Sequence, residues 1–147
     1  MKKLDTWVKF DQKSEELGTF ELAPLERGMG LTVGNALRRV LLSSVEGVAV
    51  TQVRIEGVQH EFDSIEGIQE DVIDILCNLR QIVFSVFDGE PTREITLDVK
   101  GIMEVKASDL TLPSDVTIIN ADQHIASITK KTTELKVTMV VEKNVGF

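Results

Sequence analysis

The sequence predicts an α+β fold in which two helices are interspersed among mostly antiparallel strands. Two segments, after Leu25 and after Ser64, repeat apolar residues at the spacing of one helix face. Several others alternate apolar and polar residues, as half-buried strands do. The clearest alternation carries Leu135, Val137, Met139 and Val141. Helices mixed with antiparallel strands are typical of the α+β class.

Composition sets the first limits on function. The 147 residues suit one domain or two small lobes, and the net charge of −8 argues against this chain gripping DNA by itself. No apolar run approaches the ~20 residues of a membrane span, and the first residues lack the apolar core of a signal peptide. The single cysteine, Cys77, excludes an internal disulfide and agrees with a reducing cytosol.

The first residues predict two short strands. Trp7, Val8 and Phe10 form the first, and the segment 11–16 is expected to be a loop. The segment 17–25 alternates better, and Pro24 is expected to end it.

The most specific segment of the sequence is residues 25–44, LERGMGLTVGNALRRVLLSS. Its three glycines predict a tight, irregular turn before a helix that ends near Ser44. A stripe at helical spacing predicts the buried face of that helix. The glycines are Gly28, Gly30 and Gly34, and the stripe is Val33, Ala36, Leu37, Val40 and Leu41.

The opposite face of this helix groups Asn35, Arg38, Arg39 and Leu42. An apolar anchor with a charged rim is typical of a protein-docking surface, whereas the plain alternative is a solvated polar face. The glycine spacing does not fit a phosphate-binding loop. Two arginines in an acidic chain are also a weak nucleic-acid footprint.

The next segments predict a strand and a second helix. Val48 and Val50 take one phase of the strand and Val53 and Ile55 the other, which predicts a bulge between them. A helix is expected over residues 64–83, with Glu66, Glu70 and Asp71 near its positive end. Its core stripe is Ile68, Val72, Ile75, Leu76, Leu79, Ile82 and Val83, and Ile73 and Cys77 are expected to pack on another lobe.

Short strands fill the remaining sequence. They are expected at 84–87, followed by a turn at Asp88–Gly89, and then around Ile95–Val99, Val116–Ile118 and Ile125–Ile128.

A metal or acid–base site is conceivable only at His60, Glu61 and Asp63. These residues alternate faces if extended, and the only other histidine is His124. A surface histidine beside acidic groups is the favoured interpretation, so no catalytic, metal or cofactor-binding residue is predicted.

The stretch 25–44 closely resembles the first block of the bacterial and plastid RNA polymerase alpha subunit, N-terminal domain. The resemblance continues through Val53–Gly57, His60–Phe62 and GIQEDVIDILCNL from Gly67 to Leu79, and covers most of the chain. It implies a non-catalytic subunit of a nucleotidyltransferase, located in the bacterial cytoplasm or plastid stroma. Two copies of such a subunit dimerise and dock the beta and beta-prime subunits for transcription.

The resemblance also implies a division into lobes. Residues 1–46 would be the first half of a dimerisation lobe made of a sheet and helices. Residues 47–147 would be an inserted, mainly antiparallel lobe with one helix, expected to be incomplete. The expected dimerisation residues are Val33, Leu37, Val40 and Leu41. The expected subunit-binding residues are Asn35, Arg38, Arg39 and Leu42, together with His60, Glu61 and Phe62.

The last residues, VEKNVGF, depart from the family's basic, glycine-rich run, and the family's second dimer-interface helix does not follow. This departure argues against stable dimerisation of this chain by itself. It also supports an alternative, a shortened alpha-like protein that binds polymerase subunits and regulates or blocks their assembly.

Overall fold

The computed structural model describes residues 5–14, 17–87 and 91–146, which belong to two compact units. One unit runs up to Val45 and the other from Glu46 to Gly146. The strands pair in antiparallel sheets and two α-helices lie among them, so the predicted α+β class is confirmed. Neither helix is long and apolar enough to cross a membrane in the part of the chain that the structure describes.

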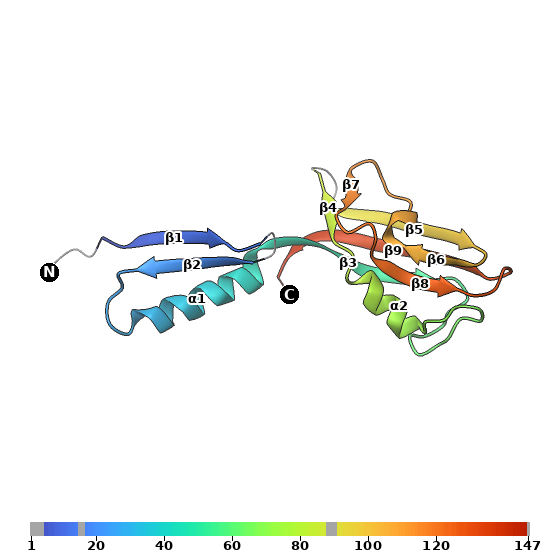
Figure 1. Cartoon of the computed structure of the whole chain (residues 1–147), viewed down its shortest axis with the longest axis horizontal. Coiled ribbons are helices and arrows are strands. Elements are labelled where there is room, and N and C mark those ends of the chain that lie inside the picture. The colour runs from blue at the N-terminus through green and yellow to red at the C-terminus, as the bar shows by residue number, and fades with distance from the viewer. Residues whose placement is uncertain (1–4, 15–16, 88–90, 147) are drawn as a thin grey trace. The chain divides into compact units, whose positions relative to one another are not determined.

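The unit up to Val45, hereafter unit 1, contains a hairpin and a helix (Figure 1). Strand β1 (Trp7–Gln12) pairs antiparallel with β2 (Gly18–Ala23), and the rings of Phe10 and Phe20 lie opposite each other with centroids 4.6 Å apart. The segment 11–16 was predicted to be a loop, but β1 extends through Gln12 because Thr19 and Gly18 pair with its last residues. Residues 15 and 16 of that predicted loop lie outside the described residues.

Helix α1 (Met29–Ser44) begins earlier than the sequence predicted. Gly30 and Gly34 are helical, so the prediction of an irregular turn through all three glycines is wrong. Only Gly28, at the position before the helix, has a left-handed φ, of 87°. A glycine inside a helix costs about 1 kcal/mol relative to alanine, so Gly30 and Gly34 lower the intrinsic stability of α1.

The apolar stripe of α1 is not buried within this chain. Ala36, Leu37, Val40 and Leu41 are exposed and Val33 is half-buried, so the prediction of a buried face is wrong for the chain by itself. No described residue of unit 1 is fully buried. The physical reason is size, because one hairpin and one helix supply too little chain to enclose an apolar core.

The unit from Glu46 to Gly146, hereafter unit 2, is organised around a three-stranded antiparallel sheet (Figure 1). Its order is β3 (Glu46–Ile55), β9 (Glu134–Val145) and β5 (Thr92–Lys100). The pairing register of β3 shifts between Val50 and Gln52, which confirms the predicted bulge. The alternation of β9 is also confirmed, because Leu135, Val137, Met139 and Val141 are all buried.

Helix α2 (Val72–Leu79) is much shorter than the predicted helix over residues 64–83. The side chain of Asp71 caps it by accepting a hydrogen bond from the Asp74 backbone N–H, 2.9 Å away. Residues 64–71 instead form turns joined to strand β8 (His124–Ile128), where the Gln69 N–H donates to the Ser127 carbonyl. These long-range bonds outweigh the helical pattern of the sequence.

The predicted stripe of α2 is confirmed where the helix forms, since Val72, Ile75 and Leu79 are buried. The expectation that Val83 belongs to the core is wrong, because its side chain is exposed beyond the end of the helix. Ile73 and Cys77 are exposed.

Two smaller strand pairs complete unit 2. Strand β4 (Phe84–Val86) pairs with β7 (Val116–Ile118), and β6 (Met103–Lys106) pairs with β8 before the short 3-10 turn η1 (Ala107–Asp109). The turn predicted at Asp88–Gly89 lies outside the described residues. All the described buried apolar side chains belong to unit 2, so the hydrophobic core lies there.

Gly67 provides a test of the loop that replaces the first half of the predicted helix. Its φ is +86°, and a Cβ there would collide with the Thr133 hydroxyl, which donates to the Glu66 carbonyl. We expect Gly67→Ala to lower the free energy of unfolding by about 2 kcal/mol or more in denaturant titrations, through strain and collision together.

Gly57→Ala is the matched control for that experiment. Gly57 has a φ of +81°, but nothing lies within 4 Å of a Cβ built on it. Gly57→Ala should therefore lower the free energy of unfolding through backbone strain alone, by about 1 kcal/mol. Equal losses in the two variants would show that the contact with Thr133 contributes nothing.

Candidate functional site

Helix α1 presents two exposed faces with different chemistry. Asn35, Arg38, Arg39 and Leu42 follow the i, i+3, i+4, i+7 spacing and therefore share one face of a regular helix. All four are exposed, with Leu42 at 53%. Among the described residues neither arginine has an ion-pair partner, so both guanidinium groups are available to an external acceptor.

The apolar face holds Val33, Leu37, Val40 and Leu41. The exposed fractions of the last three are 53%, 56% and 63%. The helix has no side-chain cap at its start, no acidic residue in its first turn and no basic residue in its last turn. Because capping does not support the helix ends, its stability depends on packing of this face.

In unit 2, a loop between β3 and α2 carries the other predicted binding residues. His60, Glu61 and Phe62 are all exposed there, with Phe62 at 75%. Asp63 holds the loop in shape, since its Oδ2 accepts the Gln59 N–H at 3.0 Å and the His60 N–H at 3.2 Å. These backbone hydrogen bonds, that of Gln59 above all, keep the pKa of Asp63 below its ordinary value.

The geometry of this loop does not support a metal site at His60, Glu61 and Asp63. His60 Nε2 lies 3.1 Å from Asp63 Oδ1, so two of the three candidate ligands contact each other. The second oxygen of Asp63 is occupied by backbone N–H groups. Across the described residues, no group of three or more potential ligands is placed to hold a metal ion.

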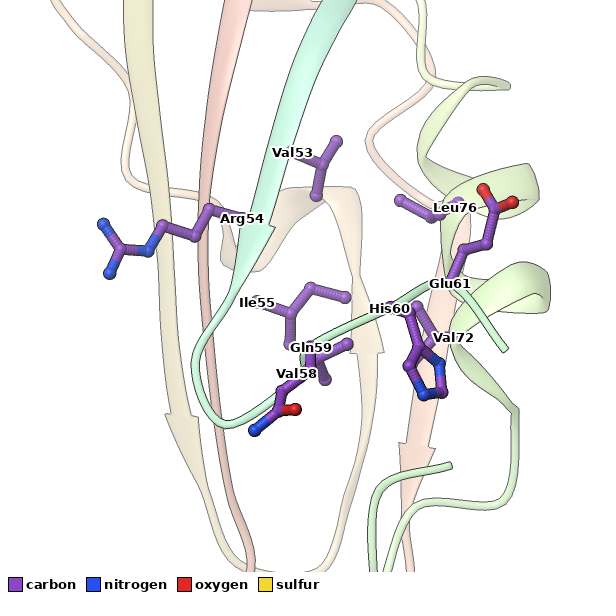
Figure 2. Close-up of a pocket in the computed structure, with 9 residues that line it drawn as sticks. All are labelled: Val53, Arg54, Ile55, Val58, Gln59, His60, Glu61, Val72 and Leu76. Atoms are coloured by element: carbon purple, nitrogen blue, oxygen red, sulfur yellow. The ribbon is translucent and has the colours of Figure 1, made fainter. Parts of the chain in front are cut away.

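A cleft of about 320 Å³ opens between the end of β3 and α2. Figure 2 shows Val53, Ile55 and Val58 on one side and Val72 and Leu76 of α2 on the other. Arg54, Gln59, His60 and Glu61 also line it, and the side chain of Arg54 projects away from the apolar residues (Figure 2). The cleft thus combines an apolar floor with a polar rim, and two of the predicted binding residues belong to that rim.

Sequence reasoning missed a polar network centred on Glu70. Its carboxylate accepts hydrogen bonds from the Ser127 N–H at 2.6 Å and the Ser127 hydroxyl at 3.1 Å, and lies 2.8 Å from His124 Nε2. The other ring nitrogen, Nδ1, is 3.3 Å from Glu104 Oε1 but lacks the alignment of a hydrogen bond, so we regard Glu70 as the group that orients the ring. Residues more than fifty positions apart give no local sequence signal for such a network.

The network has a defined effect on the titration of Glu70. Partial burial would raise the pKa of this carboxyl, but the hydrogen bonds from Ser127 and His124 outweigh it and hold the pKa below the ordinary 4.5. The network ties the loop before α2 to β8, so its role in the described structure is to fix the base of α2.

Comparison with known proteins identifies the family. The model of the RNA polymerase Rpb3/RpoA insert domain matches residues 53–147. This chain belongs to that family. The insert-domain match includes the cleft, the loop from Gly57 to Asp71 and the network around Glu70.

The similarity of this chain to individual proteins covers more of the sequence than the insert-domain match and includes unit 1. A protein named DNA-directed RNA polymerase subunit alpha in Aquifex aeolicus is 46% identical over 140 residues, which is 95% of this chain. Proteins of the same name in Rubrobacter xylanophilus and Limosilactobacillus reuteri are 45% and 43% identical over 139 and 136 residues. The chain spans 44%, 44% and 43% of the lengths of these three relatives.

The Glu70 network predicts a specific response to acid. A carboxyl whose pKa is lowered by folding stabilises the protein above about pH 4.5, and that contribution is lost as the pH falls through the folded pKa. We expect Glu70→Gln to lower the free energy of unfolding by about 1 kcal/mol at pH 7. Denaturant titrations at pH 7 and pH 3 should show a smaller loss of stability with acid in the variant than in the wild type.

Glu94→Gln serves as the control, because Glu94 is exposed on β5 and forms no ion pair with a described residue. This variant should leave unchanged both the free energy of unfolding at pH 7 and the loss of stability between pH 7 and pH 3. An unaltered acid dependence in Glu70→Gln would contradict the role assigned to the network.

Proposed function

We propose that this chain acts as a non-catalytic assembly subunit of DNA-dependent RNA polymerase, which dimerises and docks the beta and beta-prime subunits. The observation that carries the proposal is the 46% identity over 95% of the chain to a protein named DNA-directed RNA polymerase subunit alpha. In this proposal the chain is one subunit of a nucleotidyltransferase, RNA polymerase, and the catalytic centre of that enzyme belongs to the large subunits. The proposed location is the cytoplasm, or the stroma if the source is a plastid.

The exposed surfaces of α1 support the assembly role. A helix without end caps whose apolar face is open to water gains stability when another protein surface covers that face. We assign Val33, Leu37, Val40 and Leu41 to the dimer contact. A continuous apolar stripe of this kind suits the central, desolvated part of an interface.

The polar face of the same helix is assigned to the large subunits. Arg39 is the main candidate, with Asn35, Arg38 and Leu42 beside it. A guanidinium group can donate two parallel hydrogen bonds to a carboxylate or to backbone carbonyls across an interface. The unpaired state of Arg39 in the described structure leaves these donors available.

The loop residues His60, Glu61 and Phe62 form a second proposed contact. Their exposure, and the hydrogen bonds by which Asp63 fixes the loop, make them a preorganised surface. The net charge of −8 supports contacts with protein rather than directly with DNA, and the proposal requires no cofactor.

Arg39 gives the most direct test of the docking assignment. We expect Arg39→Ala to weaken capture of purified beta subunit by about tenfold or more, as loss of a central interface arginine does. The melting temperature should stay unchanged, because the Arg39 side chain is exposed and the hydrogen bond from the Ser43 hydroxyl goes to the Arg39 backbone carbonyl, which the substitution keeps. Capture is measured by pull-down across a range of beta-subunit concentrations.

Two further variants make the result specific. Arg39→Lys keeps the charge but not the paired donors, so it should restore little binding. Arg27→Ala removes an exposed arginine just before α1 and should leave binding intact. Full binding by Arg39→Ala would overturn the assignment of this face.

A further inference from the structure

We propose that the open edge of β3 and the cleft beside it receive an extended segment of a large polymerase subunit as an added antiparallel strand. The inference rests on the proposed function and names the way in which unit 2 holds its partner. The occupant is defined by its chemistry, as a segment with an apolar side chain facing the cleft and an acidic side chain on the opposite face.

The backbone at the end of β3 is available for strand addition. β3 is an edge strand, and the Glu56 N–H donates to the Lys136 carbonyl of β9 at 3.0 Å. Groups that face the partner strand alternate along an antiparallel ladder, so Arg54 also faces β9 and Val53 directs its N–H and C=O to the open edge. The neighbouring outward carbonyl, of Ile55, is occupied by the Val58 N–H.

The opposite edge of the sheet is bridged at Thr96 of β5, whereas no isolated bridge is made by β3 within the described residues. On β5, Thr96 exchanges both backbone hydrogen bonds with Thr111, at 2.8 and 3.4 Å. Proteins commonly cover their strand edges because an uncovered edge recruits other strands. Within the described residues, β3 has β9 as its only ladder partner.

The cleft supplies the side-chain selectivity that an added strand needs. Alternate side chains of a strand at the β3 edge would face the same side of the sheet as Val53 and Ile55, toward Leu76. Val53, Val58 and Leu76 are each half-buried, so an apolar side chain placed among them would complete their burial. The volume of about 320 Å³ admits a large aliphatic or aromatic side chain.

Charge defines the other face of the occupant. Arg54 lies at the rim of the cleft, its side chain projects away from the apolar residues (Figure 2), and it has no ion-pair partner among the described residues. A side chain directly across from it on an added strand would lie within cross-strand contact distance, where an opposite charge is favourable. An acidic residue next to the apolar anchor therefore matches both faces of the β3 edge.

Amide hydrogen exchange tests the added strand directly. The full chain is measured alone and in complexes with purified beta and with purified beta-prime, with exchange resolved at single residues. We expect the Val53 amide to exchange readily in the free chain and to become at least about tenfold slower in one complex. The Arg54 amide, bonded to β9 in both states, is the internal reference.

A pair of leucine variants tests the cleft. Leu76→Ala removes half-buried apolar atoms from the cleft, and Leu112→Ala makes the same change next to Thr111, at the opposite edge of the sheet. The subunit to test is the one, beta or beta-prime, whose binding slows exchange of the Val53 amide. We expect Leu76→Ala to bind it about tenfold more weakly and Leu112→Ala to bind it almost unchanged. Melting temperatures of both variants separate lost binding from lost folding.

The outcomes distinguish this inference from the proposed function. A complex that forms while the Val53 amide stays unprotected overturns the added strand and leaves the proposed function standing. Failure of both large subunits to bind overturns the proposed function. Protection of Val53 that rises with the concentration of this chain alone would show a second copy as the occupant, and would also overturn the inference.

Discussion

The antiparallel pairing of β3 with β9 is the interaction on which the rest of unit 2 depends. It presents one face of the sheet to the core, where Leu135, Val137 and Met139 are buried against the elements that include α2. The bulge after Val50 allows both phases of β3 to contribute half-buried or buried side chains to that face. The same pairing leaves β3 at an edge of the sheet, where we propose that a partner strand is added.

Unit 1 follows the opposite physical logic. Its hairpin and helix form from local signals, yet none of its described residues is fully buried. The apolar stripe of α1 therefore has the spacing of a buried face but is exposed in the described structure, and the proposed assembly role would account for its exposure. Unit 2 is stabilised by its own packing, whereas the apolar surface of unit 1 is exposed in the described structure.

Local patterns predicted most of the strands and the two faces of α1, because alternation and helical spacing depend only on residues that are close in the sequence. They failed at residues 64–71, where bonds to β8 and the left-handed Gly67 replace a helix that the pattern favours. They failed again in expecting a buried face on α1, since periodicity shows which side chains share a face and not what covers it. The Glu70–His124 pair joins distant segments, so no local signal could reveal it.

The central claim is that the apolar face of α1 is an interface covered by another protein surface. The most direct measurement is hydrogen exchange of the α1 amides in the chain alone, over a range of concentrations, with sedimentation velocity on the same samples. Our account predicts weak protection in dilute monomer and protection that rises together with self-association. Strong protection of α1 in a monomer at the lowest concentration would contradict it, because the helix would then be stable without a partner.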